Sequence, residues 1–163
     1  MNLYLIRHGL AAERGTYAND EARPLTEEGQ RKTRQVAKRF LQLGLRFDRL
    51  LTSPLVRAEQ TAEILVKVGL SDRAEELSCL APDGDIQDWL GWLRSQSLAS
   101  DASVALVGHE PDLSHWAEQL VWGEARGQLI LKKAGAIGVS IPNLTDPIAQ
   151  ASLFWLAPPR LIL

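Results

Sequence analysis

The sequence lacks the features that mark several common classes of protein. It has one cysteine, Cys79, so no disulfide can form within the chain, and a cytoplasmic location is expected. No apolar run approaches the ~20 residues that a membrane-spanning helix needs, and residues 1 to 10 do not have the pattern of a signal peptide. The net charge is -2, so nothing indicates a nucleic-acid partner.

Several binding and catalytic motifs are also missing. Neither His-Glu-x-x-His, nor paired cysteines, nor Gly-x-x-x-x-Gly-Lys occurs, so we predict no metal, no other cofactor and no nucleoside triphosphate. A cysteine-dependent phosphatase would need an arginine six positions after its cysteine, where this chain has Asp85. An aspartate nucleophile would need Asp-x-Asp after a strong strand, whereas Asp83-Gly84-Asp85 follows Ala81-Pro82.

What the sequence does contain is typical of one globular α/β domain covering residues 1–163. Hydrophobic residues make up 45% of the 163 residues and charged residues 23%, which is ordinary for such a domain. Apolar runs at residues 2–7, 47–52 and 103–107 indicate strands, and helical segments follow them. This alternation predicts a mostly parallel sheet with helices on both faces.

The other expected elements come from local signals. Two further strands are expected at 136–141 and 151–156, at the edge of the sheet, with a short strand near 76–79. Helices are expected from the N-cap Thr26 to about Leu43, from the N-cap Ser53 and Pro54 to Gly69, from the N-cap Asp85 onward, and from Pro111 to about Trp122. Pro158-Pro159 is expected to end regular structure.

Cationic and titratable side chains occur at the carboxyl ends of three expected strands. The first strand ends in Arg7-His8-Gly9, the second leads to Arg57, and the third leads to His109. Ligands of open α/β sheets bind outside the carboxyl ends of strands. We therefore expect these residues to meet in one site.

The residue types suit a phosphoryl group. The guanidinium groups of Arg7 and Arg57 match phosphate oxygens in pairs of hydrogen bonds. His8 can accept a phosphoryl group covalently, and the cations around it favour its neutral, nucleophilic form. His109 can donate to a phosphate oxygen, and Gly9 allows close approach of the backbone to a ligand.

These three motifs, in this order, resemble those of the histidine phosphatase superfamily, also called phosphoglycerate-mutase-like. The short chain and Arg23-Pro24-Leu25-Thr26 look most like the SixA-type phosphohistidine phosphatases. The resemblance implies a three-layer α/β/α sandwich, with His8 as the phosphorylated nucleophile and Arg7, Arg57 and His109 completing the phosphate pocket. The substrate it implies is a histidine-phosphorylated protein, such as a phosphotransfer domain or phosphorelay kinase.

The chain departs from the superfamily pattern at two positions where acidic residues are usual. Leu10 stands where many members have an acidic residue, and no proton-donating glutamate aligns in the middle region. The candidates are Glu75, Glu76, Asp83, Asp85 and Glu110. A phosphate ester expels an alkoxide and needs a strong proton donor, whereas a phosphohistidine expels imidazole. The missing acid therefore favours phosphohistidine as substrate.

Two alternatives remain open from the sequence. One is a phosphatase, or a mutase, for small phosphate esters in the same superfamily. The other is a module that binds a phosphoprotein without turnover, which would keep Arg7, Arg57 and His109 but would not need His8. His115, on the helix after Pro111, is expected to be an ordinary surface or core-edge histidine.

Overall fold

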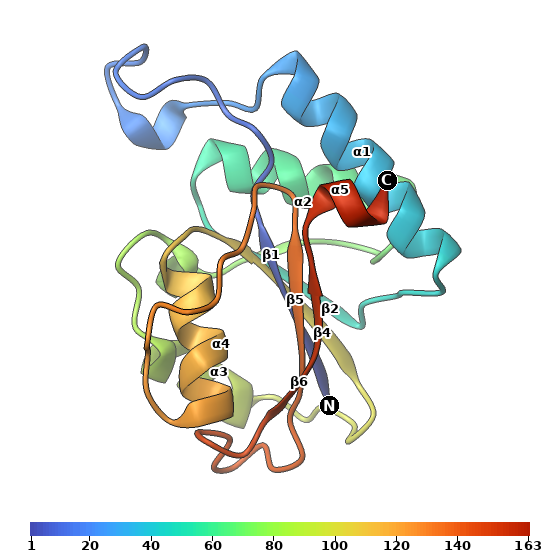
Figure 1. Cartoon of the computed structure of the whole chain (residues 1–163), viewed down its shortest axis with the longest axis vertical. Coiled ribbons are helices and arrows are strands. Elements are labelled where there is room, and N and C mark those ends of the chain that lie inside the picture. Colours follow the sequence, from blue (N-terminus) through green and yellow to red (C-terminus); the bar gives the residue numbers. More distant parts are fainter.

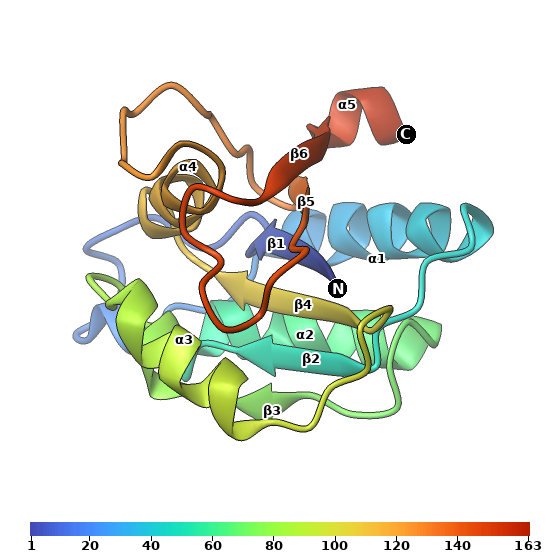
Figure 2. The same ribbon diagram turned by 90° about the horizontal axis from the view of Figure 1, so that it is seen from below.

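The six strands form one sheet in the order β3-β2-β4-β1-β5-β6, which Figure 2 follows from β3 to β6. In the computed structural model, which describes residues 1–163, β1 to β4 run parallel to one another. At one edge of the sheet, β5 pairs antiparallel with β1, and β6 pairs antiparallel with β5. The strands are β1 Asn2–Arg7, β2 Arg49–Thr52, β3 Glu75–Glu76, β4 Ser103–Gly108, β5 Ala136–Ser140 and β6 Ser152–Ala157. The predicted mostly parallel sheet is confirmed.

Helices cover both faces of the sheet and complete the three-layer α/β/α sandwich (Figure 1). One face carries α1 (Glu27–Gln42) and α2 (Val56–Val68), and the other carries α3 (Ile86–Ser95) and α4 (Asp112–Trp122). A short helix, α5 (Pro159–Ile162), lies beside α1, and two 3-10 turns span Asp20–Ala22 and Ser78–Leu80. No helix has the length and apolar character that crossing a membrane requires.

The central strand β4 is apolar from Val104 to Val107 because both of its faces are buried. In β4, Val104 and Leu106 pack in the core under α3 and α4, while Ala105 and Val107 pack in the core under α1 and α2. Successive side chains of a strand point to opposite faces, so a strand between two helical layers must be apolar at every position. This explains why the apolar run at residues 103–107 does not alternate with polar residues.

The strand register brings the ends of β1, β2 and β4 to one level. Arg7 pairs with Gly108, and Thr52 pairs with Val107. The residues that follow these positions therefore emerge side by side at the carboxyl edge of the sheet. The antiparallel β5 starts at Ala136, opposite Ile6, so the segment that precedes β5 reaches the same edge.

Local capping predictions had mixed outcomes. The Thr26 and Asp85 caps are confirmed, because their side chains accept from the backbone N–H of Gly29 and Gln87. The Ser53 cap is wrong: α2 begins at Val56, and the Ser53 hydroxyl instead accepts from the N–H of Leu55, 3.2 Å away, in the turn before the helix.

Three other boundaries differ from the prediction. Pro111 is the N-cap of α4 rather than its first residue. The strand expected near 76–79 is two residues long and gives way to a 3-10 turn. Regular structure does not end at Pro158-Pro159, because Pro159 is the first residue of α5, where a missing N–H leaves no intrahelical bond unmade.

Candidate active site

The four polar residues predicted from the sequence line one cavity at the carboxyl edge of the sheet. The cavity has a volume of about 780 Å³ and is lined by Arg7, His8, Arg57 and His109. Gly9 does not line it: its N–H donates to the Thr61 hydroxyl at 3.0 Å. A Cβ at Gly9 would lie 2.3 Å from the Thr33 hydroxyl, so this glycine permits close packing of the backbone against α1.

His8 is held as a neutral imidazole with a defined tautomer. Its Nδ1 lies 2.7 Å from the carbonyl oxygen of Gly9. Because a carbonyl oxygen can only accept, Nδ1 carries the hydrogen and the lone pair is on Nε2. Burial lowers the pKa of His8 to about 3. The hydrogen bond to Gly9 acts in the opposite direction and raises the pKa, whereas the charges of Arg57 and Arg7 lower it further. His8 is therefore prepared to act as a nucleophile at neutral pH.

His109 faces His8 across the cavity. The two ring centroids are 5.2 Å apart, and His109 Nε2 lies 2.8 Å from the Ser53 hydroxyl. Burial and the positive charge of Arg57 lower the pKa of His109 to about 4. Burial and the cationic neighbours disfavour a charged imidazole at His109. A bound phosphate would supply negative charge and so raise the pKa of His109 again.

The two arginines retain hydrogen-bonding capacity. Arg7 Nη1 donates to the carbonyl of Leu131 at 2.9 Å, and Arg57 donates to the carbonyl of Asp20 at 2.8 Å and to its carboxylate at 3.0 Å. The Nε atoms of Arg7 and Arg57 are buried and have no partner within the protein. A buried donor without an acceptor costs on the order of 1–3 kcal/mol, so an anion between the two guanidinium groups would be stabilising.

Asp20 is a site residue that the sequence did not indicate. Its carboxylate binds both Arg57 and Arg23, whose Nε lies 2.8 Å from Asp20 Oδ1. Burial raises the pKa of Asp20, but the hydrogen bond from Arg23 and the charge of Arg57, with the further contacts to both arginines, together outweigh burial and hold the pKa below its usual value. Asp20 lies in a loop without periodicity, so only the fold brings it to Arg57.

Among the candidate acids, Glu110 alone lines the cavity. Its carboxylate accepts from the N–H and the hydroxyl of Ser114, at 3.1 and 2.7 Å. Glu75 is paired with Arg49 on the sheet, and Asp85 caps α3. The other two predicted candidates, Glu76 and Asp83, do not line the cavity, whereas Glu13, which was not among the candidates, does.

The wall of the cavity next to Arg7 is built on a buried carboxylate. Glu118 of α4 is fully buried and accepts backbone N–H groups from residues 126–129. This segment continues to Leu131, whose carbonyl holds Arg7, and to Ala134, whose N–H lies 3.1 Å from the Arg7 carbonyl and 3.2 Å from that of His8. Glu118 thus positions the segment that orients the Arg7-His8 pair.

The remaining cysteine and histidine of the chain, Cys79 and His115, lie outside the cavity. Cys79 does not line the cavity, and burial, together with the charge of Asp88, raises the pKa of its thiol to about 11. His115 is also outside the cavity. No group of three or more histidine, cysteine, aspartate and glutamate side chains is arranged to hold a metal ion.

The two cavity histidines should make the free energy of unfolding decrease as the pH is lowered. Their pKa values of about 3 and about 4 lie below the ~6.5 of an unfolded chain. The stability they contribute is complete above that value and is lost as pH falls, since the unfolded chain then binds protons that the folded chain does not. Each histidine adds a slope of about 1.4 kcal/mol per pH unit.

Urea unfolding between pH 6 and 4.5 checks this expectation. His109→Gln, which cannot titrate, should lower the pH slope of the unfolding free energy by about 1.4 kcal/mol per unit, and His8→Gln should do the same. Equal slopes in wild type and both variants would show that the histidines are not held neutral in the folded protein.

Fold and site together define an α/β protein with a cavity at the carboxyl ends of parallel strands that brings two arginines to a neutral histidine. Comparison with known proteins agrees. Residues 3–80 match the model of the histidine phosphatase superfamily (branch 1). Phosphohistidine phosphatase SixA of Escherichia coli (strain K12) is 34% identical over 125 residues, covering 76% of each chain.

Two further relatives cover almost the entire chain. An uncharacterized protein from Picosynechococcus sp. (strain ATCC 27264 / PCC 7002 / PR-6) is 50% identical over 164 residues, covering 100% of this chain and 99% of its own. A solved structure of the protein histidine phosphatase SixA complexed with tungstate is 28% identical, with a TM-score of 0.84 and 98% of each chain covered. The chain belongs to the histidine phosphatase superfamily, within its SixA-like phosphohistidine phosphatases.

Proposed function

We propose that this protein is a phosphohistidine phosphatase that hydrolyses the N–P bond of a histidine-phosphorylated protein through a phosphorylated His8. The observation that carries the proposal is the state of His8: a neutral imidazole with its lone pair on Nε2, in a cavity that also presents two arginine side chains with unpartnered N–H groups. This is what in-line attack on a phosphorus atom requires.

Binding would place the substrate phosphoryl oxygens among the cations. Arg7 and Arg57 donate hydrogen bonds to these oxygens. His109 donates from a ring N–H, because the negative charge of the phosphate favours its protonated form. Asp20 must release Arg57 when the phosphate arrives, because its carboxylate occupies the same guanidinium group. The phosphoryl group then takes the place of the Asp20 carboxylate at Arg57, so the net charge next to this guanidinium group changes little.

In the first step, the lone pair of His8 Nε2 forms a new N–P bond. The N–P bond to the substrate breaks, and its electron pair stays on the departing imidazole, whose other ring nitrogen carries the proton that makes it neutral. The Gly9 carbonyl, which accepts from Nδ1–H, stabilises the positive charge that develops on the His8 ring. Arg7 and Arg57 stabilise the equatorial oxygens.

In the second step, water attacks the phosphorus of phospho-His8. A P–O bond forms, the Nε2–P bond breaks, and its electrons return to Nε2. The protons of the water stay with the phosphate that leaves. His8 ends as the neutral Nδ1–H tautomer in which it began, because the hydrogen bond to Gly9 favours that tautomer throughout.

The acids of the cavity support a phosphohistidine rather than an ester. Glu110, the only predicted acid candidate there, already accepts from two groups of Ser114. An alkoxide leaving group depends on a general acid, whose contribution is typically about 10²–10⁴-fold. An imidazole leaving group does not. The second candidate function, an ester phosphatase, would rest on Glu110 or Glu13 acting as that acid.

A substrate panel tests the proposal. Phosphate release is measured from a histidine-phosphorylated phosphotransfer domain, from 3-phosphoglycerate and from an aryl phosphate, with and without a chelator. We expect kcat/KM for the phosphoprotein to exceed that for the esters by about 10²-fold or more, given the missing acid. The chelator should change none of the rates. Faster release from the esters would instead support the small-molecule phosphatase, with Glu110→Gln and Glu13→Gln as the next variants.

A further inference from the structure

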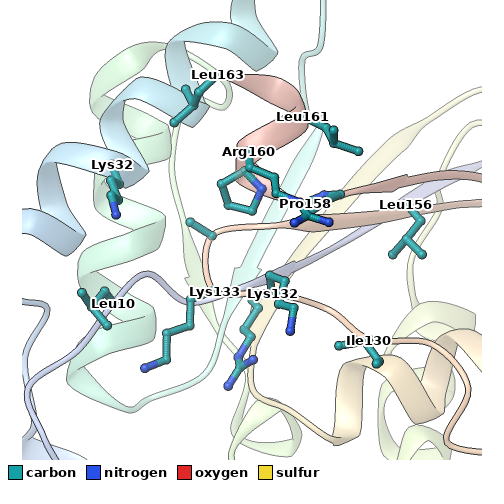
Figure 3. Close-up of a pocket in the computed structure, with 13 residues that line it drawn as sticks. Leu10, Lys32, Ile130, Lys132, Lys133, Leu156, Pro158, Arg160, Leu161 and Leu163 are labelled. Atoms are coloured by element: carbon teal, nitrogen blue, oxygen red, sulfur yellow. The ribbon is translucent and has the colours of Figure 1, made fainter.

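A second concave surface adjoins the catalytic cavity. Figure 3 shows the side chains that line this second surface. This groove has a volume of about 1050 Å³ and is bordered by α1, by the segment before β5, by the end of β6 and by α5. Arg7, Leu10 and Lys133 line both the groove and the catalytic cavity. A molecule that occupies the groove therefore reaches the phosphate site without leaving the protein surface.

The apolar side chains of the groove are unusually exposed. Ile130 is 63% exposed, Leu156 41%, Leu161 75% and Leu163 60%. The whole chain has eight exposed large apolar side chains, so half of them line this one groove. Exposed apolar side chains that gather in one place, with polar residues around them, mark interaction sites, whereas scattered ones do not.

The charged side chains that line the groove all have one sign. Its charged residues are Arg7, Lys32, Lys132, Lys133 and Arg160, and no acidic residue lines it. Lys32 pairs with Glu28 at 2.6 Å, but Lys132, Lys133 and Arg160 form no ion pair with any residue of the chain. The chain as a whole has a net charge of -2, so this local excess of positive charge is a property of the groove and not of the surface in general.

We propose that the groove is the docking surface for the phosphohistidine-bearing protein, and that this partner presents a helix with an apolar ridge and flanking carboxylates beside its phosphohistidine. The inference rests on the proposed function. Complementary charge favours this partner: carboxylates would meet the unpaired Lys132 and Arg160, while the ridge would cover the exposed leucines. Shared lining residues place the phosphoryl group in the catalytic cavity while the ridge lies in the groove.

The shape of the surface favours a protein over a membrane. A groove accepts a convex element, and a helix with its side chains is about 10–12 Å across, whereas a flat bilayer would contact only the rim. Anionic lipid nonetheless has matching charge, and a second copy of this chain has matching apolar surface. Both occupants are outcomes of the experiment below.

The test separates docking from chemistry. The phosphoprotein is a phosphotransfer domain with carboxylates and apolar side chains around its phosphohistidine, and the small substrate is free phosphohistidine. The double variant Lys132→Glu with Arg160→Glu, and separately Leu161→Ser, are compared with wild type. We expect each to raise KM for the phosphoprotein on the order of tenfold, with kcat/KM for free phosphohistidine within about twofold of wild type.

Matched controls change the same residue types elsewhere. Arg34→Glu with Lys38→Glu alters two exposed cations of α1 that do not line the groove, and Leu43→Ser alters an exposed leucine outside it. Both controls should keep the wild-type KM for the phosphoprotein. Raising the salt concentration should increase KM for the wild type more than for the charge-reversed variant, because exposed ion pairs are screened.

Each other outcome overturns a specific claim. If wild type hydrolyses both substrates and the groove variants keep the wild-type KM, docking in the groove is wrong and the phosphatase stands. If wild type hydrolyses neither substrate, the proposed function fails and the docking proposal with it. Sedimentation with phosphatidylserine-containing vesicles, abolished by the groove variants while KM is unchanged, would assign the surface to a membrane. A dimer lost in Leu161→Ser, with KM unchanged, would assign it to a second copy.

Discussion

Replacing His8 with alanine is expected to abolish phosphate release from every phosphorylated substrate while binding of a phosphate-like anion persists. The His8 imidazole is neutral, because its pKa is lowered to about 3, and its Nε2 lone pair is free, because Nδ1–H is bound to Gly9, whereas Nε2 of His109 is bonded to the Ser53 hydroxyl. The two cations to which we assign phosphate binding, Arg7 and Arg57, do not depend on His8 for their hydrogen bonds. We therefore expect loss of kcat by about 10³-fold or more.

Two measurements check this expectation. Phosphate release is followed with the phosphoprotein, and binding of tungstate is followed by calorimetry, in wild type and in His8→Ala. His115→Ala is the matched control, since this histidine does not line the cavity and should leave both quantities unchanged. A kcat within tenfold of wild type in His8→Ala would mean that water attacks the substrate directly.

The covalent intermediate offers an independent readout. Wild type mixed briefly with radiolabelled phosphoprotein and quenched in alkali should carry label on His8, because phosphohistidine survives alkali. His8→Ala should carry none. Label retained by the variant would place the nucleophile on another residue and would remove the observation on which the proposed function rests.

Arg57→Ala is expected to weaken both anion binding and turnover, on the order of 10²-fold or more in kcat/KM. The guanidinium group is buried, lies at the start of α2 and has an unpartnered Nε. It is needed in the ground state, to neutralise the phosphate, and more strongly in the transition state, where charge spreads over the equatorial oxygens. Arg57→Lys should recover only part of the loss, because an ammonium group cannot form the paired hydrogen bonds.

The contact between Arg57 and Asp20 supplies the control for this variant. Asp20→Asn removes the ion pair of 3.0 Å but keeps the cation that would bind phosphate. If Arg57 acts on phosphate, Asp20→Asn should bind tungstate at least as tightly as wild type, since an internal competitor has gone. If Arg57 serves only to hold the loop that contains Asp20, the two variants should lose activity equally.

Most of the site was predictable because its residues follow strongly apolar strands. Arg7 is the last residue of β1, His8 and His109 come directly after β1 and β4, and Arg57 follows β2 by a few residues. The carboxyl ends of parallel strands meet at one edge, so their order in the sequence was enough to bring them together. The caps at Thr26 and Asp85 were predictable for a different reason, since each bonds to a backbone N–H two or three residues away.

Predictions failed where a local signal had a long-range competitor. Ser53 has the sequence of an N-cap, but its hydroxyl is bonded to His109, which is 56 residues away in the chain, and α2 begins later. The approach of the Gly9 backbone to a ligand stays a prediction, and the contacts that the structure adds are long-range ones: its N–H is bonded to Thr61, and it packs against α1. In both positions the partner is distant in the sequence, His109 after β4 for Ser53 and Thr61 of α2 for Gly9, and no local pattern indicates it.

The sequence by itself determined the layered α/β architecture and four of the cavity residues, Arg7, His8, Arg57 and His109, because hydrophobic periodicity and strand ends are local properties of the chain. Only the tertiary structure decided the tautomer of His8, the contact of Asp20 with Arg57, the support of Arg7 by Glu118 through Leu131, and the cationic groove beside the cavity. These features depend on atoms that lie far apart in sequence and meet within hydrogen-bonding distance only when the sheet has formed.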